Sequence, residues 1–338
     1  MTPLPRPILL SVVIPCTRPE SLLLSLQKLA KEVTAVGVEA IVIGDVEASG
    51  PQFPGLEVNW IPCAERHPNV RRNLGIARAR APLIGFLDDD AFPLPGWVSA
   101  ALQMDPDRNE VWTGPERAVV RGRPSALIFA VCQNRFVDGT SAHRNARSGY
   151  VSWYEIPFCN LLVPSRIFKE VGMLATDIPW DIDDFHFCFN LRTRMRFFNN
   201  PQLAICHDRY PNSIARFLTY RWKLRVRTGE KLLSHMNLYG RICPVVVSGA
   251  IPLLLLCTVV FLPFSVILLA SAFCIYLLSL FLQLIPAYRF DGRIKSMFQY
   301  VGLIALLHCS SLVGVQYGMW RRVLRNVAKL KESLSKTA

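Results

Sequence analysis

The sequence predicts an α/β domain followed by an α-helical membrane region. Two observations favour this fold class: the composition changes near residue 241, and before that point short β-rich runs alternate with helical ones. A third observation is the composition: 51% of the 338 residues are apolar and only 19% are charged. This is more apolar and less charged than the average soluble protein, and it indicates a membrane protein. This composition excludes a disordered chain, and the length suits one large or two ordinary domains.

The first 90 residues have the pattern of an open sheet with helices between its strands. Strands are expected at 9–15, 39–44, 58–61 and 82–87, with helices at 20–31 and 71–80. The last of these strands is followed directly by Asp88, Asp89 and Asp90. These acids therefore fall at the carboxyl end of a strand, where open parallel sheets bind their ligands.

Three adjacent carboxylates repel one another, and a cation usually keeps them together. Oxygen ligands suit Mg²⁺ or Mn²⁺, and Mg²⁺ commonly bridges carboxylates to substrate phosphates. A solvated acidic turn is the alternative reading of the triplet, because acidic turns are common.

The C-terminal third is expected to enter a membrane. Residues 242–286 hardly contain a charge and are about twice as long as the ~20 residues that one spanning helix needs. Pro263 lies near the middle of this stretch, so we expect two spans, at about 242–262 and 264–286. A third is expected at 297–320, followed by a basic tail at 321–338.

The distribution of charge predicts a cytosolic catalytic domain on a multi-pass protein of the cell membrane. Arg289, Arg293 and Lys295 lie between the second and third spans and agree with the positive-inside rule. Three full crossings, however, would place five basic residues of the tail outside, namely Arg321, Arg322, Arg325, Lys329 and Lys331. Either the tail is an exception to the rule, which is slightly favoured, or the third segment is re-entrant or lies at the interface.

Net charge and motifs narrow the function further. The formal charge of +13 suits anionic lipid, nucleotide phosphates or nucleic acid about equally. The basic residues gather beside the apolar spans and no nucleic-acid recognition motif is found, so nucleic acid is not an expected partner. The sequence has no glycine-rich phosphate loop, which argues against P-loop ATPases and dinucleotide dehydrogenases. We read no cleaved secretory leader, and expect the ten cysteines to be reduced.

Four segments, in order, resemble family 2 of the inverting glycosyltransferases. They are SVVIPCTR at 11–18, VIGD at 42–45, the stretch from Asn73 to Trp97 that contains the acidic triplet, and the segment from Phe158 to Leu174. The resemblance covers roughly residues 9–230. It implies a GT-A fold, which is a nucleotide-sugar-binding domain with a mixed, mostly parallel sheet, over residues 1–240.

The resemblance also implies roles for single residues. Asp45 would contact the nucleobase, Asp88 the ribose and the metal, and Asp90 the metal that bridges the donor diphosphate, with Asp89 the variable middle position. Arg72 and Asn73 would line the nucleotide pocket, although an arginine there could equally lie on a solvated helix face. The further substrate-binding positions are Pro15, Thr17, Arg18 and Asn160.

A second acidic cluster follows at 180–191, WDIDDFHFCFNL, and resembles the family's segment with the catalytic base. Asp184 would be the base and Asp183 its acidic neighbour. His186 and Asn190 depart from the family pattern, so the choice among Asp181, Asp183 and Asp184 stays open. The alternative is a helix N-terminus whose acids favour the helix dipole.

His207 and a basic stretch at 216–231 complete the candidate site. His207 resembles the family's histidine that helps to hold diphosphate or metal, although a lone histidine is more often structural. Arg221 and Arg225 share a helix face and could bind the leaving diphosphate. Alternatively, the basic stretch is an interfacial helix on anionic headgroups.

The expected function is transfer of a sugar from a nucleotide-diphospho-sugar to a lipid-linked or cell-surface glycan, with inversion and with Mg²⁺ or Mn²⁺. One alternative is a polyprenyl-phosphate sugar synthase, whose phosphate acceptor needs little base catalysis. The other is a non-catalytic membrane protein with a degenerate nucleotide-sugar fold.

Overall fold

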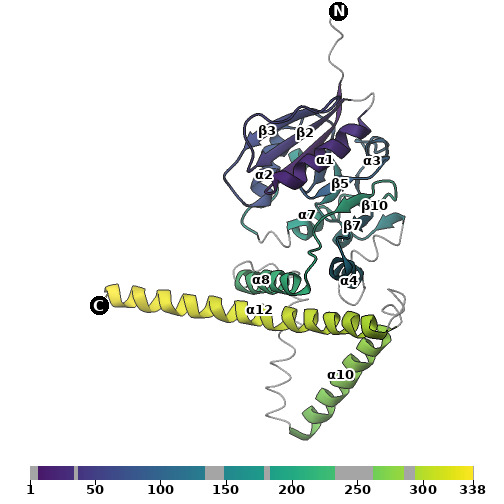
Figure 1. The fold of residues 1–338 in the computed structure, drawn as a ribbon. Coiled ribbons are helices and arrows are strands. Elements are labelled where there is room, and N and C mark those ends of the chain that lie inside the picture. The colour runs from purple at the N-terminus through teal and green to yellow at the C-terminus, as the bar shows by residue number, and fades with distance from the viewer. Residues whose placement is uncertain are drawn as a thin grey trace, which may run out of the picture. The chain divides into compact units, whose positions relative to one another are not determined.

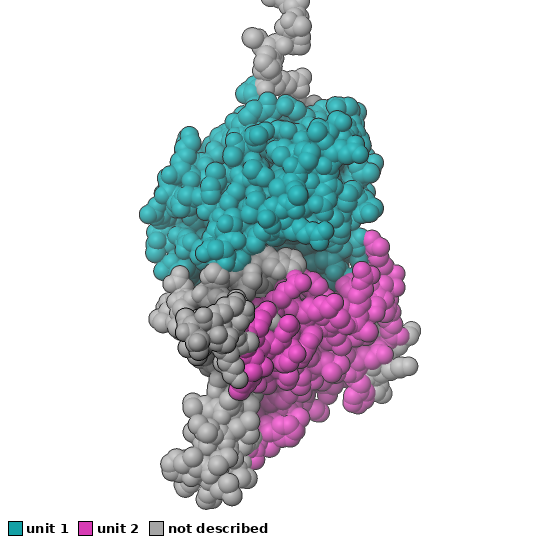
Figure 2. All heavy atoms as spheres, turned by 90° about the vertical axis from the view of Figure 1, so that its left-hand side faces the viewer, with its two compact units in different colours: residues 1–120, 138–210 teal, residues 121–137, 211–338 magenta. Residues whose placement is uncertain are grey.

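The computed structural model describes residues 7–33, 37–133, 148–178, 183–232, 262–284 and 294–337. The chain divides into two compact units, shown in different colours in Figure 2: residues 1–120 with 138–210, and residues 121–137 with 211–338. The first unit ends at residue 210, and the division near residue 240 that the sequence indicates stays a prediction.

An eight-stranded sheet forms the centre of the first unit (Figure 1). Its strand order is β3-β2-β1-β4-β9-β6-β10-β8. The strands are β1 (Ile8–Cys16), β2 (Gly37–Gly44), β3 (Glu57–Pro62), β4 (Leu83–Leu87), β6 (Glu110–Thr113), β8 (Gly149–Val151), β9 (Asn160–Pro164) and β10 (Arg196–Asn199). The strands from β3 to β4 are parallel, whereas β9 runs antiparallel to both of its neighbours and β8 to β10. The sheet is therefore mixed and mostly parallel, as the resemblance to the glycosyltransferases implies.

Helices cover both faces of this sheet. One face packs against α1 (Pro19–Glu32) and α3 (Trp97–Ala101), and the other against α2 (Pro68–Arg78), α6 (Ile167–Val171) and α7 (Asp183–Leu191). Alternation along β1 separates the two cores, because Val12 and Ile14 enter the first and Val13 enters the second. The unit is thus a three-layer α/β structure.

The six predicted elements are all present, with ends that shift by a few residues. The largest shift is at α2, which begins at Pro68 rather than near residue 71. Proline suits the first turn of a helix, and the Nδ1 atom of His67 accepts a hydrogen bond from the main-chain N–H of Asn69. The cap therefore adds almost a full turn to the helix.

A smaller three-stranded sheet lies in the same unit and brings the C-terminal part of that unit next to the acidic triplet. Its strands are β5 (Ala91–Pro93), β7 (Glu116–Ala118) and β11 (Ile205–His207). In the register of this sheet, His207 lies opposite Ala91 on β5 and Ala118 on β7. His207 is thus held one residue away from the end of the triplet at Asp90.

The second unit is helical. It contains α4 (Arg123–Cys132), α8 (Ile214–Leu232), α10 (Leu262–Leu282) and α12 (Ile294–Thr337). Among the described residues one helix, Ser296–Arg321, is long and apolar enough to cross a membrane, and it coincides with the span expected at 297–320. The helix α10 overlaps the span expected at 264–286. The span expected at 242–262 lies, apart from its last residue, outside the described residues.

Candidate active site

The three acids that follow β4 point to different partners. Asp88 is partly exposed, with 32% of its side-chain surface accessible, whereas Asp89 and Asp90 are buried. The triplet is therefore not a solvated acidic turn, because two of its three carboxylates lie inside the protein.

Asp89 anchors the turn after β1. Its carboxylate accepts hydrogen bonds from the main-chain N–H of Thr17 at 2.6 Å and of Arg18 at 2.7 Å, and from the Thr17 hydroxyl at 3.0 Å. Burial raises the pKa of Asp89, against the opposing effects of Arg18 and of the Thr17 hydrogen bonds. The middle residue of the triplet thus positions Thr17 and Arg18, both of which the sequence assigns to substrate binding.

Asp90 and Asp88 come together with His207. One oxygen of Asp90 lies 3.0 Å from Nε2 of His207, and the other accepts a hydrogen bond from Nη2 of Arg18 at 2.7 Å. Burial alone would raise the pKa of Asp90, but the hydrogen bond and charge of His207 and the charge of Arg18 lower it on balance. Potential ligand atoms of Asp88, Asp90 and His207 all lie within 4.8 Å of one another.

These three residues fit a divalent metal. Two carboxylates and an imidazole are a donor set that Mn²⁺ accepts readily, while Mg²⁺ prefers oxygen ligands. Burial would lower the pKa of His207, but Cys159, Asp90 and Glu116 beside the ring raise it well above its ordinary value. The surroundings of His207 therefore favour positive charge, which a bound cation would supply in place of the proton.

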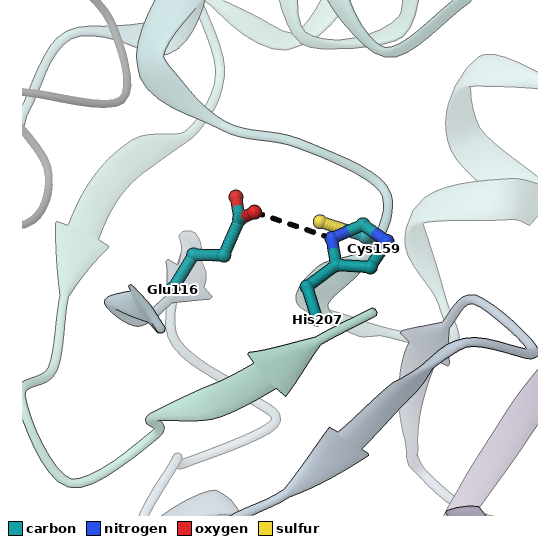
Figure 3. Close-up of side chains that lie close together, drawn as sticks. All are labelled: Glu116, Cys159 and His207. Atoms are coloured by element: carbon teal, nitrogen blue, oxygen red, sulfur yellow. Dashed lines mark ion pairs between the residues drawn. The ribbon is translucent and has the colours of Figure 1, made fainter. Parts of the chain in front are cut away.

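Behind His207 lies a buried polar cluster, shown in Figure 3. The Nδ1 atom of His207 lies 3.4 Å from Oε1 of Glu116, and the sulfur of Cys159 lies beside the same ring. Glu116 also accepts hydrogen bonds from the Tyr210 hydroxyl at 3.0 Å and from Nη2 of Arg209 at 3.1 Å. This side of the imidazole is therefore set by protein groups, which leaves Nε2 for Asp90 or a metal.

Arg72 joins the two acidic clusters. Its Nη1 donates to Asp183 at 2.6 Å and its Nη2 to Asp88 at 3.2 Å. The guanidinium lies 4.3 Å from the ring centroid of Phe158, and the side chain is buried. Asp88 and the acids of α7, which are far apart in the sequence, thus face one another across a single cation.

Asp183 and Asp184 differ in what holds them. Asp183 is buried and paired with Arg72, and it also accepts a hydrogen bond from the main-chain N–H of Asp184 at 2.9 Å. Burial, followed by the charge of Asp183, raises the pKa of Asp184 to about 7. Among the described residues no cation is paired with Asp184, and Asp181, the third candidate, lies outside them.

Asn73 has a different environment from the one that the sequence indicates. Its side chain donates to the carbonyl of Leu174 at 2.8 Å and accepts from the Leu174 N–H at 2.9 Å. Asn69 likewise donates to the carbonyl of Ala175, and Nε2 of His67 lies 2.9 Å from the carbonyl of Ile178. This face of α2 therefore holds the segment that leads toward the second acidic cluster, and Asn73 is engaged there rather than free for a nucleotide.

Arg71 is a site residue that sequence reasoning missed. It is fully buried, and its Nη2 pairs at 2.8 Å with Asp45, whose side chain is 46% exposed. Gly44 makes room for this contact, because a Cβ atom there would lie 2.5 Å from Nη1 of Arg71 and the backbone φ is +145°. Arg71 thus fixes Asp45 at the end of β2, the position assigned to the nucleobase.

The remaining predicted residues lie in less direct positions. Pro15 is buried in β1. Asn160 is 1% exposed, and its amide is used within the protein, accepting from Trp97 Nε1 and donating to the Leu203 carbonyl. Arg221 and Arg225 belong to α8 of the second unit, so their role at a diphosphate stays a prediction. The sequence could have pointed to Arg71 only through its position next to Arg72. It contained no comparable indication that Glu116 or Cys159 lies at the candidate site.

No protein-family model matches the chain, and no curated protein matches it in sequence. Solved structures do. The mannosyltransferase PcManGT from Pyrobaculum calidifontis, in complex with GDP-Man and Mn²⁺, shares 14% identity over 93% of this chain and 88% of its own, with a TM-score of 0.51. TarS from S. aureus shares 16% over 65% of this chain and 40% of its own, with a TM-score of 0.43. GalNAc-T7, with UDP, GalNAc and Mn²⁺, shares 12% over 70% of this chain and 52% of its own, with a TM-score of 0.45.

The likeness to the mannosyltransferase shows that the fold is a GT-A glycosyltransferase fold, as expected. The chain spans 40% of the length of the TarS chain that it matches. The structures of the mannosyltransferase and of GalNAc-T7 contain Mn²⁺, and a structure of TarS contains UDP-GlcNAc. At 14% identity the mannosyltransferase shows the fold alone, and the chemistry has to be argued from the site.

We expect Asp89→Asn to lower the stability of the first unit. An amide would turn its NH₂ toward groups that already donate, and leaving buried donors unpaired costs about 1–3 kcal/mol. Thermal unfolding of the purified chain in detergent measures this. Asp105→Asn is the matched control, because that carboxylate is exposed and pairs with Arg108 only at 3.7 Å. Equal melting temperatures for the two variants would contradict the anchoring role.

We expect Glu116→Gln to weaken Mn²⁺ binding about 10- to 100-fold, as is typical when the partner of a metal-binding histidine is lost. Titration of free Mn²⁺ by electron paramagnetic resonance measures the affinity directly. The control is Glu110→Gln, which changes a buried glutamate that bonds Trp112 and Tyr150. If both variants bind Mn²⁺ like the unaltered chain, Glu116 does not position His207.

Proposed function

We propose that this chain is a membrane-bound, metal-dependent glycosyltransferase of family 2 type. It would take a nucleotide-diphospho-sugar and pass the sugar, with inversion, to a lipid-linked or cell-surface glycan. One observation carries the proposal: a metal-binding set and a carboxylate pair meet around Arg72, beyond the carboxyl end of β4. Open α/β sheets bind their ligands at the carboxyl ends of their strands. The metal-binding set would then face the donor, and the carboxylate pair on the other side of Arg72 would face the acceptor.

The donor side contains Asp88, Asp90 and His207, which would hold Mn²⁺ or Mg²⁺. The bound ion would offset the negative charge of the departing nucleoside diphosphate. Arg18, whose side chain is 49% exposed beside Asp90, can reach the same phosphates. Asp45, held by Arg71 at the end of β2, is positioned for the nucleobase. The GDP-Man and Mn²⁺ in the mannosyltransferase structure support this class of donor and cofactor.

On the acceptor side, Asp184 is the general base. A sugar hydroxyl gives up its proton reluctantly at neutral pH, and a base with a pKa near 7 combines a sufficient ionised fraction with sufficient basicity. The pKa of Asp184 lies at about 7, while Asp183 already shares its charge with Arg72. Asp183 then orients Arg72 and the first turn of α7, and Asp184 accepts the proton. Displacement from the face opposite the leaving group inverts the anomeric carbon.

Membrane attachment comes from the apolar C-terminal third. The exposed surface of α10 is almost wholly apolar, with Phe273, Ile275 and Phe281 each more than half exposed. Such a surface is stable in lipid and not in water. Nucleotide sugars are made in the cytosol, so the catalytic domain would face that side.

The proposal is tested by offering the purified chain a panel of nucleotide sugars, with and without Mn²⁺. We expect hydrolysis or transfer of one donor that requires the metal and is lost in Asp90→Asn, because an amide cannot replace the charge of a metal-bridging carboxylate. Asp105→Asn serves as the control for a remote acid. Absence of binding and turnover with every nucleoside diphosphate would rule the proposal out.

The pH profile tests the base. Asp184 must be ionised to accept a proton, so transfer to a hydroxyl acceptor should rise about tenfold per pH unit below pH 7 and level off above it. Asp184→Asn should abolish transfer and leave donor affinity intact, a loss of about 100- to 10,000-fold.

Two results would change this assignment. If Asp183→Asn is inactive and Asp184→Asn active at unchanged pH dependence, the base is Asp183. If both variants retain transfer to a polyprenyl phosphate, the acceptor is a lipid phosphate that needs no base. Donor affinity, measured for each variant, separates loss of chemistry from loss of binding.

A further inference from the structure

The helix that is long and apolar enough to cross a membrane is not free of protein contacts. In the most apolar 18-residue stretch of the segment Ser296–Arg321, 33% of the residues are buried. The buried positions, among them Tyr300, Leu303, Ile304, Leu307 and Val315, lie on one side of α12. The helices α4 and α8 of the same unit cover that side, with the Tyr300 hydroxyl donating to the Ala130 carbonyl of α4.

The helix α8 lies beside the C-terminal half of the segment Ser296–Arg321 (Figure 1). Trp222 stacks on Tyr317 with ring centroids 6.1 Å apart, and Nε of Arg225 donates to the Ser311 hydroxyl at 3.2 Å. Gly229 closes on the backbone of Val315, where a Cβ atom would collide. If the segment Ser296–Arg321 crossed the membrane, residues 311–317 would lie inside the bilayer, and the part of α8 that packs on them would lie there as well.

The outer face of α8 is unsuited to hydrocarbon. Arg216, Tyr220, Lys223 and Arg227 are exposed, and their spacing of four, three and four residues places them on one side of the helix. That side is opposite Trp222, Arg225 and Gly229, which face α12. An arginine or lysine at the centre of a bilayer costs about 2.5–3.5 kcal/mol or more, so a crossing α12 would carry several such costs.

The exposed side of α12 is apolar, in contrast to the basic outer face of α8. Phe298, Leu306, Val313 and Trp320 are exposed and, at about 100° per residue, fall within a stripe about 80° wide. No charged residue occurs between Phe298 and Trp320. We call these four residues the apolar stripe.

We infer that α12 lies in the plane of the membrane interface, with the apolar stripe in lipid and α8 on its aqueous side. The partner is a lipid bilayer surface, because the stripe is apolar and the basic face of α8 remains in contact with water and headgroups. This inference rests on the proposed membrane attachment and not on glycosyl transfer. The helix α10, exposed and apolar on several sides, would enter the lipid together with the span expected at 242–262, because two crossings leave α12 on the same side as α8, which packs against it.

An in-plane α12 also removes the conflict with the positive-inside rule. The basic residues after Trp320 then lie on the same side as Arg289, Arg293 and Lys295, because no crossing separates the two groups. The alternative of an exception to the rule is no longer needed.

Depth measurement on the full chain in lipid vesicles tests the inference. In a chain whose ten native cysteines are replaced, among them the exposed Cys274 and Cys309, one new cysteine at a time replaces Phe298, Leu306, Val313 or Trp320. A fluorescent label on it is quenched by lipids brominated near the headgroup or near the end of the acyl chain. An in-plane helix gives the same shallow depth at all four positions. A crossing helix would give its deepest labels at Leu306 and Val313 and shallow ones at Phe298 and Trp320, which would overturn the inference. Leu278→Cys on α10 provides the deep reference.

A second measurement does not depend on substitutions within α12. An epitope tag after Asp291 and another after Ala338 flank the helix, and protease added to sealed vesicles of known orientation reveals the side of each tag. Tags on the same side are expected. Tags on opposite sides would show that α12 crosses and would overturn the inference, whatever the result of the donor assays.

Discussion

The buried guanidinium of Arg72 is the contact on which the rest of the site depends. It lies between Asp88, at the end of β4, and Asp183, at the start of α7. Without a cation at that point, two acidic clusters would face each other in a partly buried space, and their repulsion would raise the cost of burial steeply. The Phe158 ring lies against the guanidinium and limits the water that could screen it. The arginine therefore allows donor and acceptor groups to occupy one end of the sheet.

Three short connections bring the other groups to Arg72. The turn after β1 is tied to Asp89, the segment after α6 is tied to α2 through Asn73, and the strand β11 carries His207 to Asp90. Each connection uses a polar side chain that bonds main chain or lies in a small sheet, rather than one in the apolar core. The core sets the layers, and these polar contacts fix where the acids lie at the end of the sheet.

The sequence predicted what depends on local pattern. Buried parallel strands are continuous apolar runs, so β1, β2 and β4 and the acids after β4 could be located, and the acidic triplet and His207 do meet. It could not predict the direction of individual side chains. Asn73 and Asn160 have the residue type of ligand-binding groups, yet both are used within the protein. Arg71 and Arg72 are neighbours in sequence and contact opposite ends of the site, a difference that only the helix geometry of α2 determines.

The membrane segment shows the same limit. Hydropathy identified residues 297–320 as apolar, but α8 and that segment are about 90 residues apart, so their contact leaves no local pattern in the sequence.

Arg72 also explains why two adjacent carboxyls can do different work. Burial raises the pKa of both Asp183 and Asp184. Among the described residues the cation that contacts Asp183 is Arg72, whose charge opposes the effect of burial there, and the charge of Asp183 in turn acts on Asp184. That neighbour, added to burial, keeps the proton on Asp184 up to about pH 7. The two groups titrate as a pair, and the asymmetry between them comes from the position of one guanidinium rather than from their places in the sequence. The same cation that makes the site stable thus makes one of its acids basic enough to accept a proton.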